Sequence, residues 1–458
     1  MHESQPINLI AKYNIPGPRY TSYPTVPFWD TASFDLVEWK KRLVESFDQS
    51  NKVNGISLYI HLPFCENLCT FCGCNKRITK NHSVEEPYID ALIQEWQLYL
   101  NIFGARPIIK EIHLGGGTPT FFKPDNLKRL LETIFSTAEI ASNPLFGFEA
   151  HPNHTSKQHL DTLYQLGFRR ISFGVQEYDP DVQKAINRIQ PFEIVKKVTF
   201  EARETGYTSV SHDLVFGLPK QKSEHILDTV EKTISLKPDR ISFYSYAHVP
   251  WIKGTGQRGF SESDLPDPVY KRQLYETGRE MFQNAGYVEI GMDHFALPHD
   301  SLYIASQNGH LHRNFMGYTE SYTRLMIGLG VSSIGDTWTA FGQNEKNLED
   351  YYQKISLKEF PVYRGHLLND EDLIFRKHIL NLMCRFETHW DSDEFGKEQQ
   401  ELIFEKLQEP LKDGLIVLNE NSVTVLPQGR PFIRNICMAF DLYLHRQNPK
   451  ERIFSMTV

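Results

Sequence analysis

Short apolar runs alternate with helical patterns between residues 55 and 340. Six of these runs have the length and composition of buried strands: 56–60, 111–114, 146–149, 170–174, 209–215 and 240–244. Strands that alternate with helices in this way are typical of parallel sheets with crossover helices. We therefore predict an α/β fold, a partial (β/α)6 barrel of the TIM type.

Two of the intervening helices carry sequence signals for their boundaries. The segment from Thr155 to Gln158 fits a capping box, and Gly167 is expected to end the helix that begins there. The apolar stripe of this helix consists of Leu160, Leu163 and Tyr164. The helical period returns after Ser223, at Ile226, Leu227, Val230 and Ile234. Both patterns support helices between the strands.

The two ends of the chain follow other patterns. Residues 13–25 are rich in proline and aromatic residues, so we expect residues 1–50 to form an irregular N-terminal arm. Residues 51–360 are predicted to form the barrel domain, and residues 361–458 a mainly α-helical C-terminal domain. In the latter, helices at 372–386 and 399–407 precede a hairpin of residues 414–418 and 423–426.

The charge balance is mildly acidic and argues against nucleic acid as a partner. The chain has 57 acidic and 49 basic residues, a net charge of −8, and no basic tail or stripe. Helices followed by a hairpin could form a DNA-binding winged helix, but acidic residues slightly outnumber basic ones there, so this alternative is weak. We expect no membrane crossing, because no apolar span of about 20 residues is present. Residues 1–6 lack the features of a secretion signal, so we expect a cytoplasmic protein.

Four of the six cysteines lie within ten residues, at Cys65, Cys69, Cys72 and Cys74. Thiolates suit iron–sulfur clusters and zinc. The first three, spaced C-x3-C-x2-C, can hold three irons of a four-iron cluster and leave the fourth iron open to a ligand. A disulfide framework is improbable, because such frameworks belong to short secreted chains. Structural zinc is the stronger rival, but zinc ligands usually come as two separated pairs, so the spacing favours iron–sulfur.

The other two cysteines, Cys384 and Cys437, lie in apolar helical contexts. We expect both to be buried and chemically inert, as most free cysteines in cores are.

Unusual residues recur where the predicted strands end. The first strand leads into the cysteine loop, and the later ones lead to 115–120, 149–152, 174–177, Asp213 and 247–248. In parallel α/β barrels the functional residues gather at this rim. The pattern therefore predicts a single site at one face of the barrel.

Three successive glycines, Gly115 to Gly117, follow the second strand. Such a run can bring backbone close to a ligand and leave amide groups free to bind it; the alternative is a tight turn. Glu149, Gln176 and Asp213 could bind an amino group or ribose hydroxyls, and Arg188 a carboxylate. Ordinary capping or surface roles are equally compatible with these polar residues.

The cysteine loop followed by Gly-Gly-Gly-Thr-Pro resembles the radical S-adenosylmethionine enzymes. In that family three cysteines hold a [4Fe–4S] cluster, and the methionine part of S-adenosylmethionine chelates the fourth iron. The narrower resemblance is to the oxygen-independent coproporphyrinogen III oxidases. It covers nearly the whole chain, in the segments 13–25, 72–76, 213–221, 293–296, 312–318 and 434–440.

The resemblance implies roles for particular residues. Cys65, Cys69 and Cys72 would hold the cluster. Cys74 would be an additional cysteine that lies near the cofactor but does not ligate the cluster. The positions implied to contact S-adenosylmethionine are Tyr59, Phe71, Cys74, Gly116, Gly117, Thr118, Glu149, Gln176, Arg188, Asp213, Ala247 and Ile334. The positions implied to be catalytic are Tyr59, Glu149, Phe315 and Ile334.

Two residues depart from the family pattern. Family members typically have glutamine after the phenylalanine that matches Phe315, beside a second S-adenosylmethionine. This chain has Met316, which cannot donate a hydrogen bond, so the second cofactor site is left open. The other departure is His151, where aspartate is usual.

The implied reaction is the anaerobic conversion of the ring A and B propionates of coproporphyrinogen III to vinyl groups in haem biosynthesis. The implied partners are this substrate and a reduced flavodoxin- or ferredoxin-like donor, and the mixed surface suits a monomer. Arg19 and Arg313 are candidate partners for the substrate carboxylates. Two related functions remain as alternatives: a haem-binding chaperone, and a radical methyltransferase that degrades haem. Cys74, Asn75 and Lys76, together with the long arm, favour the oxidase.

Overall fold

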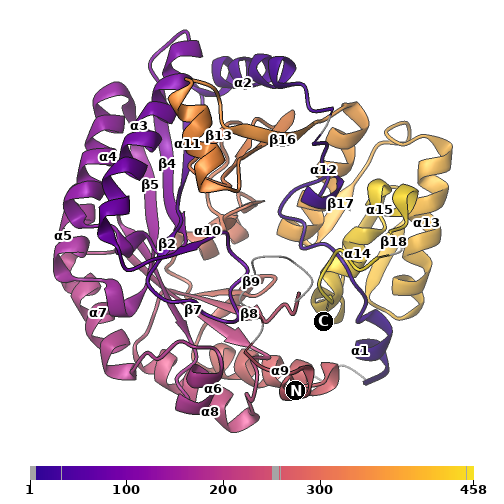
Figure 1. The fold of residues 1–458 in the computed structure, drawn as a ribbon. Helices are drawn as coiled ribbons and strands as arrows, with labels where there is room; N and C mark the ends of the chain where they lie inside the picture. The colour runs from indigo at the N-terminus through magenta and orange to yellow at the C-terminus, as the bar shows by residue number, and fades with distance from the viewer. Residues whose placement is uncertain (1–6, 32, 250–256, 258, 450, 458) are drawn as a thin grey trace.

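A computed structural model describes residues 7–31, 33–249, 257, 259–449 and 451–457. Residues 1–6, which we expected not to form a secretion signal, lie outside this range. The described part contains a twelve-stranded sheet with the order β16-β15-β14-β13-β1-β4-β5-β6-β7-β8-β10-β9. Its two ends, β16 and β9, are not paired with each other, so the sheet is open (Figure 1).

All six predicted strands are present and mutually parallel, which confirms the partial α/β barrel. They are β1 (Ile56–Leu62), β4 (Ile108–Gly116), β5 (Glu139–Ala150), β6 (Arg170–Gln176), β7 (Ser209–Phe216) and β8 (Arg240–Ser245). Strand β13 (Met326–Leu329) adds a seventh parallel strand beside β1. Antiparallel strands extend the sheet: β14 (Ile334–Asp336), β15 (Ala340–Asn344) and β16 (Val362–Leu367) at one edge, β10 (His294–Ala296) and β9 (Val288–Gly291) at the other.

Helices cover the outer face of the parallel strands (Figure 1). They are α3 (Glu85–Ile102), α4 (Pro124–Thr137), α5 (Lys157–Gln165), α7 (Phe192–Thr205), α8 (Ser223–Ser235) and α9 (Pro268–Asn284). Strand β1 shows how the sequence builds this layer, because alternate side chains of a strand point to opposite faces. Ile56, Leu58 and Ile60 are fully buried in the main apolar core. Tyr59 and His61 lie on the opposite face of the strand, inside the barrel.

The start of α5 differs by one residue from the prediction. Ser156, not Thr155, is the N-cap: its hydroxyl accepts from the amide of His159, and the His159 ring accepts from the Ser156 amide. The Thr155 hydroxyl instead donates to the carbonyl of His151 at 2.9 Å. The capping box is therefore real but displaced, because Thr155 is already engaged by the preceding turn.

The N-terminal arm begins with α1 (Ile7–Tyr13), continues as an irregular segment, and then contains α2 (Leu36–Ser50). Helix α2 was not predicted, although Trp39, Leu43 and Phe47 follow the helical period and pack on the main core. The irregular segment packs on the C-terminal region. The hydroxyl of Tyr20, for example, donates to Asp441 at 3.1 Å.

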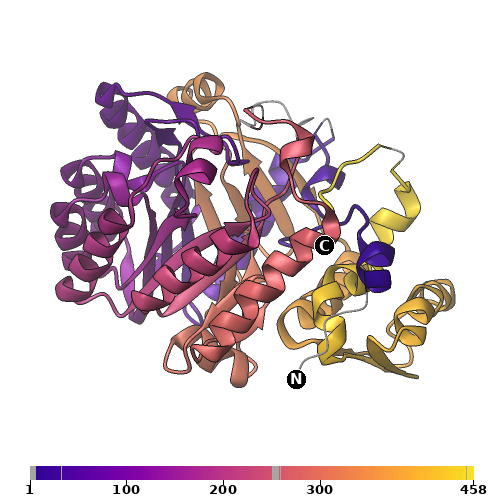
Figure 2. The ribbon, with the colours of Figure 1, turned by 90° about the horizontal axis from the view of Figure 1, so that it is seen from below.

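The C-terminal region is mainly helical, as predicted, and packs in a second apolar core that it shares with the arm and with side chains from residues 290–318. Its helices include α12 (Asp370–Arg385), α13 (Lys397–Lys412), α14 (Ile433–Met438) and α15 (Leu442–Gln447), and the predicted hairpin is β18 (Ile416–Asn419) with β19 (Ser422–Val425). Strand β17 (Glu387–His389) completes this small sheet. Figure 2 shows this region beside the barrel, with α1 next to it. The domain limits at residues 50/51 and 360/361 stay predictions.

Cys384 and Cys437 are both buried in the C-terminal core. Burial raises the pKa of Cys384 to about 12 and that of Cys437 well above its usual value. The expectation of inert thiols agrees with this environment. Among the described residues, no helix is both long and apolar enough to cross a bilayer.

Candidate active site

The cysteine loop leaves the end of β1 and is fixed at both its base and its tip. At the base, β2 (Phe64–Cys65) pairs in parallel with β3 (Arg77–Ile78). At the tip, the amide of Thr70 donates to the carbonyl of Ile186 at 3.0 Å, and Asn187 Nδ2 donates to the carbonyl of Leu68 at 2.7 Å. The loop is thus held against the segment that follows β6.

The predicted cluster ligands, Cys65, Cys69 and Cys72, are half-buried free thiols on this loop. Two polar side chains reach the sulfurs: the hydroxyl of Thr118 lies 3.2 Å from Cys65 Sγ, and Arg188 Nη1 lies 3.6 Å from Cys69 Sγ. The loop therefore presents its thiols next to polar side chains from the segments that follow β4 and β6.

Cationic side chains favour thiolates in the loop. A hydrogen bond with the Cys74 thiol, supported by the charges of Lys76 and Arg188, lowers the pKa of Cys72 to about 6. Burial raises the pKa of Cys65 to about 11. Lys76 Nζ also donates to the carbonyls of Cys72 and Cys74, at 3.1 and 3.3 Å. Metal binding requires deprotonated thiols, and these charges aid deprotonation at Cys72.

The three glycines were predicted to leave amide groups free for a ligand, but the structure shows a different reason for them. Gly116 has φ +117°, and a Cβ there would lie 2.7 Å from the His61 ring; a Cβ on Gly117 would lie 2.5 Å from the Pro63 carbonyl oxygen. The amide groups are not free. Gly117 donates to the Leu62 carbonyl at 2.9 Å, and Gly116 donates to Glu149 Oε2 at 3.2 Å. The run of glycines thus lets the end of β4 approach the cysteine loop.

Glu149, at the end of β5, is hydrogen-bonded from two sides. Besides the Gly116 amide, His113 Nε2 lies 3.4 Å from its Oε1. Although burial opposes ionisation, the hydrogen bonds from His113 and Gly116 lower the pKa of Glu149. The carboxylate is therefore kept charged at the rim of the barrel.

Tyr59 belongs to the same group of side chains. Its ring lies 6.1 Å from that of His113, nearly parallel, and its hydroxyl donates to His61 Nδ1 at 3.1 Å. His61 Nε2 in turn donates to the carbonyl of Asn75 at 2.9 Å, and burial lowers its pKa, so the ring is neutral. A continuous hydrogen-bonded path thus connects Tyr59 to the cysteine loop.

Gln176 and Arg188 converge over Gly174 at the end of β6. A Cβ on Gly174 would lie 2.7 Å from Gln176 Nε2 and 2.9 Å from Arg188 Nη2. Asp213 is the register partner of Gly174 on β7 and accepts from the hydroxyl of Ser172 at 2.8 Å. Burial raises the pKa of Asp213 to about 6, with a contribution from Glu149. The predicted polar residues of three strand ends are thus brought together.

Phe71 and Ala247 are connected by a residue that sequence reasoning missed. The side chain of Gln257 donates to the carbonyls of both, at 3.2 Å and 2.9 Å, and it is buried. A lone glutamine carries no sequence signal for such a role. His61 and His113 were also missed, although both are polar residues on the inner face of otherwise apolar strands.

Phe315 and Ile334 lie in a separate apolar cluster with the arm residue Trp29. The rings of Phe315 and Trp29 are 5.8 Å apart. Ile334 approaches the main site through its backbone: its carbonyl oxygen lies 2.6 Å from where a Cβ of Gly328 would be, and Gly328 is the register partner of Tyr59.

The two candidate partners of substrate carboxylates lie side by side but differ in exposure. Arg313 is buried, with its guanidinium over the Tyr318 ring at 4.6 Å, and its Nη2 donates to the Arg19 carbonyl at 3.3 Å. The side chain of Arg19 is about a third exposed and lies 3.5 Å from Asp293. Only Arg19 is thus open to a ligand from solvent.

The comparisons with known proteins agree with this geometry. The family described as the radical SAM superfamily matches residues 59–233. The oxygen-independent coproporphyrinogen III oxidase of Escherichia coli (strain K12) is 38% identical over 461 residues, which cover 98% of each chain. The enzyme of the same name from Pseudomonas aeruginosa is 36% identical over 450 residues and 96% of each chain.

The chain belongs to the oxygen-independent coproporphyrinogen III oxidase family. A solved coproporphyrinogen III oxidase from Escherichia coli, described as a radical SAM enzyme, aligns with a TM-score of 0.89 and 35% identity. The alignment covers 96% of this chain and 99% of that one. The predicted family and the open α/β architecture are confirmed.

Membership in this oxidase family also confirms the predicted cofactors, a [4Fe–4S] cluster and S-adenosylmethionine. Three cysteine thiols are the donor set that such a cluster needs, and Thr118 and Arg188 lie beside the sulfurs of Cys65 and Cys69. Among the described residues the side chains are not grouped as they would be around a bound metal ion. The assignment of individual residues to the cluster and to S-adenosylmethionine stays a prediction.

Proposed function

We propose that the chain catalyses the anaerobic oxidative decarboxylation of the ring A and B propionates of coproporphyrinogen III, giving protoporphyrinogen IX. Each propionate loses one hydrogen atom, carbon dioxide and one electron, and a vinyl group remains. The observation that supports this most strongly is the identity of 38% over nearly the whole chain to an enzyme named for the reaction. The rim of the barrel has the polar groups that such chemistry needs.

In this proposal Cys65, Cys69 and Cys72 would hold the cluster and leave one iron for S-adenosylmethionine. Thr118 and Arg188 lie beside the sulfurs of Cys65 and Cys69, where their hydrogen bonds would tune the reduction potential of a bound cluster. Cys74, the more exposed thiol, stays outside the ligand set and interacts with Cys72. Held by Cys65, Cys69 and Cys72, the reduced cluster with S-adenosylmethionine would supply the carbon radical chemistry that removes a hydrogen atom from the propionate β-carbon.

The surrounding residues bind and orient the cofactor rather than react. Glu149 is charged and can accept from the amino group of S-adenosylmethionine, while Gln176 and Asp213 suit ribose hydroxyls. Arg188 has a buried Nε without a hydrogen-bond partner among the described residues, so its guanidinium retains a donor for the cofactor carboxylate. The proposed contacts made by backbone or apolar groups are those of Phe71, Gly116, Gly117, Thr118, Ala247 and Ile334.

Tyr59 and Phe315 complete the proposed site from two directions. Tyr59 is held by His61 beside Glu149, where it bounds the cofactor pocket. Phe315 and Ile334 pack with Trp29 of the arm and would exclude water from the far side. Met316, which follows Phe315, leaves the use of a second S-adenosylmethionine open.

The enzyme is proposed to act as a monomer in the cytoplasm, with a reduced flavodoxin- or ferredoxin-like protein as its electron donor. The catalytic domain is proposed to span residues 51–360. No specific observation favours the haem chaperone, the haem-degrading methyltransferase or a DNA-binding protein.

The test is an anaerobic assay of the reconstituted enzyme with dithionite, S-adenosylmethionine and coproporphyrinogen III. We expect 5′-deoxyadenosine and protoporphyrinogen IX, and loss of both with Cys69→Ala. Formation of 5′-deoxyadenosine without decarboxylation would contradict the assignment of coproporphyrinogen III as the substrate. An intact reduced cluster that cleaves no S-adenosylmethionine would overturn the enzyme function.

A further inference from the structure

Two adjoining hollows lie between the ends of β7 and β8, helix α9, the arm and the C-terminal tail. They share Arg19 and Ser245, and we call them together the cationic cavity. Its remaining lining includes Lys271, Asp293, Arg434 and Arg452. The larger hollow has a volume of about 140 Å³, well above the roughly 10–15 Å³ that a cavity needs to hold one water. There is therefore space for a polar group of a ligand.

Lys271 is built into this cavity from α9. Gly217, which follows β7 with φ +78°, makes room for it: a Cβ there would lie 2.8 Å from Lys271 Cε. The ammonium group donates to the carbonyl of Tyr246 at 3.0 Å. An ammonium has three donors, so two remain for other acceptors in the cavity.

Positive charge exceeds negative charge around Lys271. The charged groups with the largest effect on it are the three cations Arg19, Arg434 and Arg452 and the anion Asp293. The cavity is also lined by the anion Glu289 and by the cations Arg272 and Arg430. Burial, reinforced by the first three cations, lowers the pKa of Lys271 to about 7. A bound anion would compensate this excess, because an opposite charge stabilises the protonated amine.

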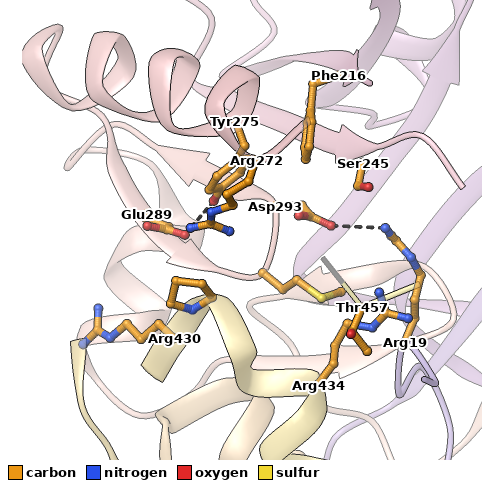
Figure 3. Close-up of a pocket in the computed structure, with 12 residues that line it drawn as sticks. Arg19, Phe216, Ser245, Arg272, Tyr275, Glu289, Asp293, Arg430, Arg434 and Thr457 are labelled. Atoms are coloured by element: carbon orange, nitrogen blue, oxygen red, sulfur yellow. Dashed lines mark hydrogen bonds and ion pairs between the residues drawn. The ribbon is translucent and has the colours of Figure 1, made fainter. Parts of the chain in front are cut away.

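Arg434 holds the walls of the cavity rather than its contents. Its guanidinium donates to the carbonyls of Gly17, Pro18 and Met456, and so connects the arm to the C-terminal tail. The side chain of Arg19 comes from the same part of the arm and lies 3.5 Å from Asp293 (Figure 3). Arg19 and Lys271 are thus two cations of the lining that a ligand can reach.

The cavity continues the proposed cofactor pocket. Its larger hollow is lined by Tyr246 and Ala247, and Ala247 is a proposed contact of S-adenosylmethionine. Gln257 connects the Ala247 carbonyl to that of Phe71 in the cysteine loop. A ligand that extends from the cluster past the end of β8 would therefore reach Arg19 and Lys271.

We infer that the cationic cavity binds a propionate carboxylate of the tetrapyrrole that does not react, with Arg19 and Lys271 as its cationic partners. This inference rests on the proposed function. Two of the four propionates of coproporphyrinogen III keep their carboxylates, and a reacting propionate must lie at the radical source instead. A remote carboxylate anchor orients the substrate for reaction.

The test measures binding of two stable porphyrins to the holoenzyme by fluorescence quenching. Coproporphyrin III has all four propionates, and mesoporphyrin IX has only the two on rings C and D. We expect Lys271→Met to weaken the binding of both porphyrins by roughly tenfold, because one charged hydrogen bond is lost. Lys271→Arg should restore most of the affinity, and Lys232→Met, on the exposed face of α8, should leave it unchanged.

Each other outcome overturns the inference. If Lys271→Met weakens only the binding of coproporphyrin III, a reacting propionate lies in the cavity. If it leaves the affinities for both porphyrins unchanged, Lys271 does not bind a carboxylate. Failure of Lys271→Arg to restore affinity, with unchanged cluster content, would show that the charge of Lys271 is not what binds. The proposed function is tested separately by the anaerobic assay. It fails if the wild-type enzyme cleaves S-adenosylmethionine but forms no protoporphyrinogen IX.

Discussion

Arg188 reaches from the segment after β6 to the cysteine loop, where its Nη1 lies 3.6 Å from Cys69 Sγ. The same guanidinium donates to the carbonyl of Gly174 at the end of β6. One side chain therefore connects a barrel strand to a proposed cluster ligand. In the proposed site, Arg188 would therefore position the cluster and the cofactor relative to each other.

Replacing Arg188 by methionine should weaken S-adenosylmethionine binding by at least about tenfold, because a charged hydrogen bond contributes about 1.5–3 kcal/mol. Equilibrium dialysis of the reconstituted enzyme measures this. Arg77→Met is the matched control, since Arg77 is also near the loop but is mostly exposed and pairs with Glu349. Equal affinities of wild type and Arg188→Met would contradict the assignment of Arg188 to the cofactor.

Gly117→Ala should prevent assembly of the cluster. Its Cβ would lie 2.5 Å from the Pro63 carbonyl oxygen, so the start of the cysteine loop must shift, at a cost of about 1–3 kcal/mol for overpacking. We expect most of the bound iron and the cluster absorbance to be lost. Gly73→Ala is the control in the same loop, because a Cβ there has no atom within 4 Å. If both variants retain full iron, the close approach does not matter for the cluster.

Asp213→Asn should stabilise the protein at neutral pH while weakening cofactor binding. Burial raises the pKa of Asp213 to about 6, so the charged form is penalised in the folded state. The stability that the raised pKa contributes is fully present below pH 3.8 and is lost as pH rises through 6. At pH 7 Asp213→Asn should therefore raise the free energy of unfolding by on the order of 1–3 kcal/mol.

Thermal unfolding at pH 4 and pH 7 checks this prediction for Asp213. The gain should shrink toward pH 4, where aspartic acid is protonated in the folded state. An Asp213→Asn variant that is less stable than wild type at pH 7 would contradict it.

Glu320→Gln should destabilise the end of the barrel at which β6 and β8 begin. Glu320 is buried and lies 2.9 Å from Arg170 and 3.4 Å from Arg240. Removing the charge leaves two buried arginines less compensated, which costs about 3–5 kcal/mol when a buried pair is broken. Glu132→Gln is the control, because Glu132 is exposed and 3.8 Å from Lys128; its effect should stay below about 0.5 kcal/mol.

The pH dependence of the Glu320 effect has a defined sign. Although burial opposes ionisation, Arg170 and Arg240 lower the pKa of Glu320 far below its usual range. The stabilisation is therefore complete above the ordinary carboxyl pKa of about 4.3 and decreases as pH falls below it. Denaturant unfolding of wild type and variant at pH 7 and pH 3 should show a smaller difference at pH 3. A constant difference would contradict the charge-based cause.

Much of the proposed site is encoded locally. The strand that ends before Cys65 and the one that ends at Glu149 both appear in the sequence as short apolar runs. Parallel strands place their carboxyl ends at one rim, so the association of Glu149, Gln176 and Asp213 follows once the strands are identified. The cysteine spacing likewise needs no tertiary information.

Other features depend on contacts between distant segments, which periodicity does not encode. The amides of Gly116 and Gly117 are occupied by Glu149 and Leu62, so the glycines serve packing rather than open ligand binding. Gln257 joins Phe71 to Ala247 across about 180 residues of chain. Neither relationship has a sequence pattern of its own.

The parallel strands, the thiol loop and the polar rim could be predicted from the sequence, because they depend on spacing along a single element. Which cations line the cationic cavity depends on long-range packing and has no such pattern. Arg19, Lys271 and Arg434 come from the arm, α9 and α14, and they form one cavity because these segments pack together. Long-range packing sets which charges meet, and so it decides where a charged substrate can be held.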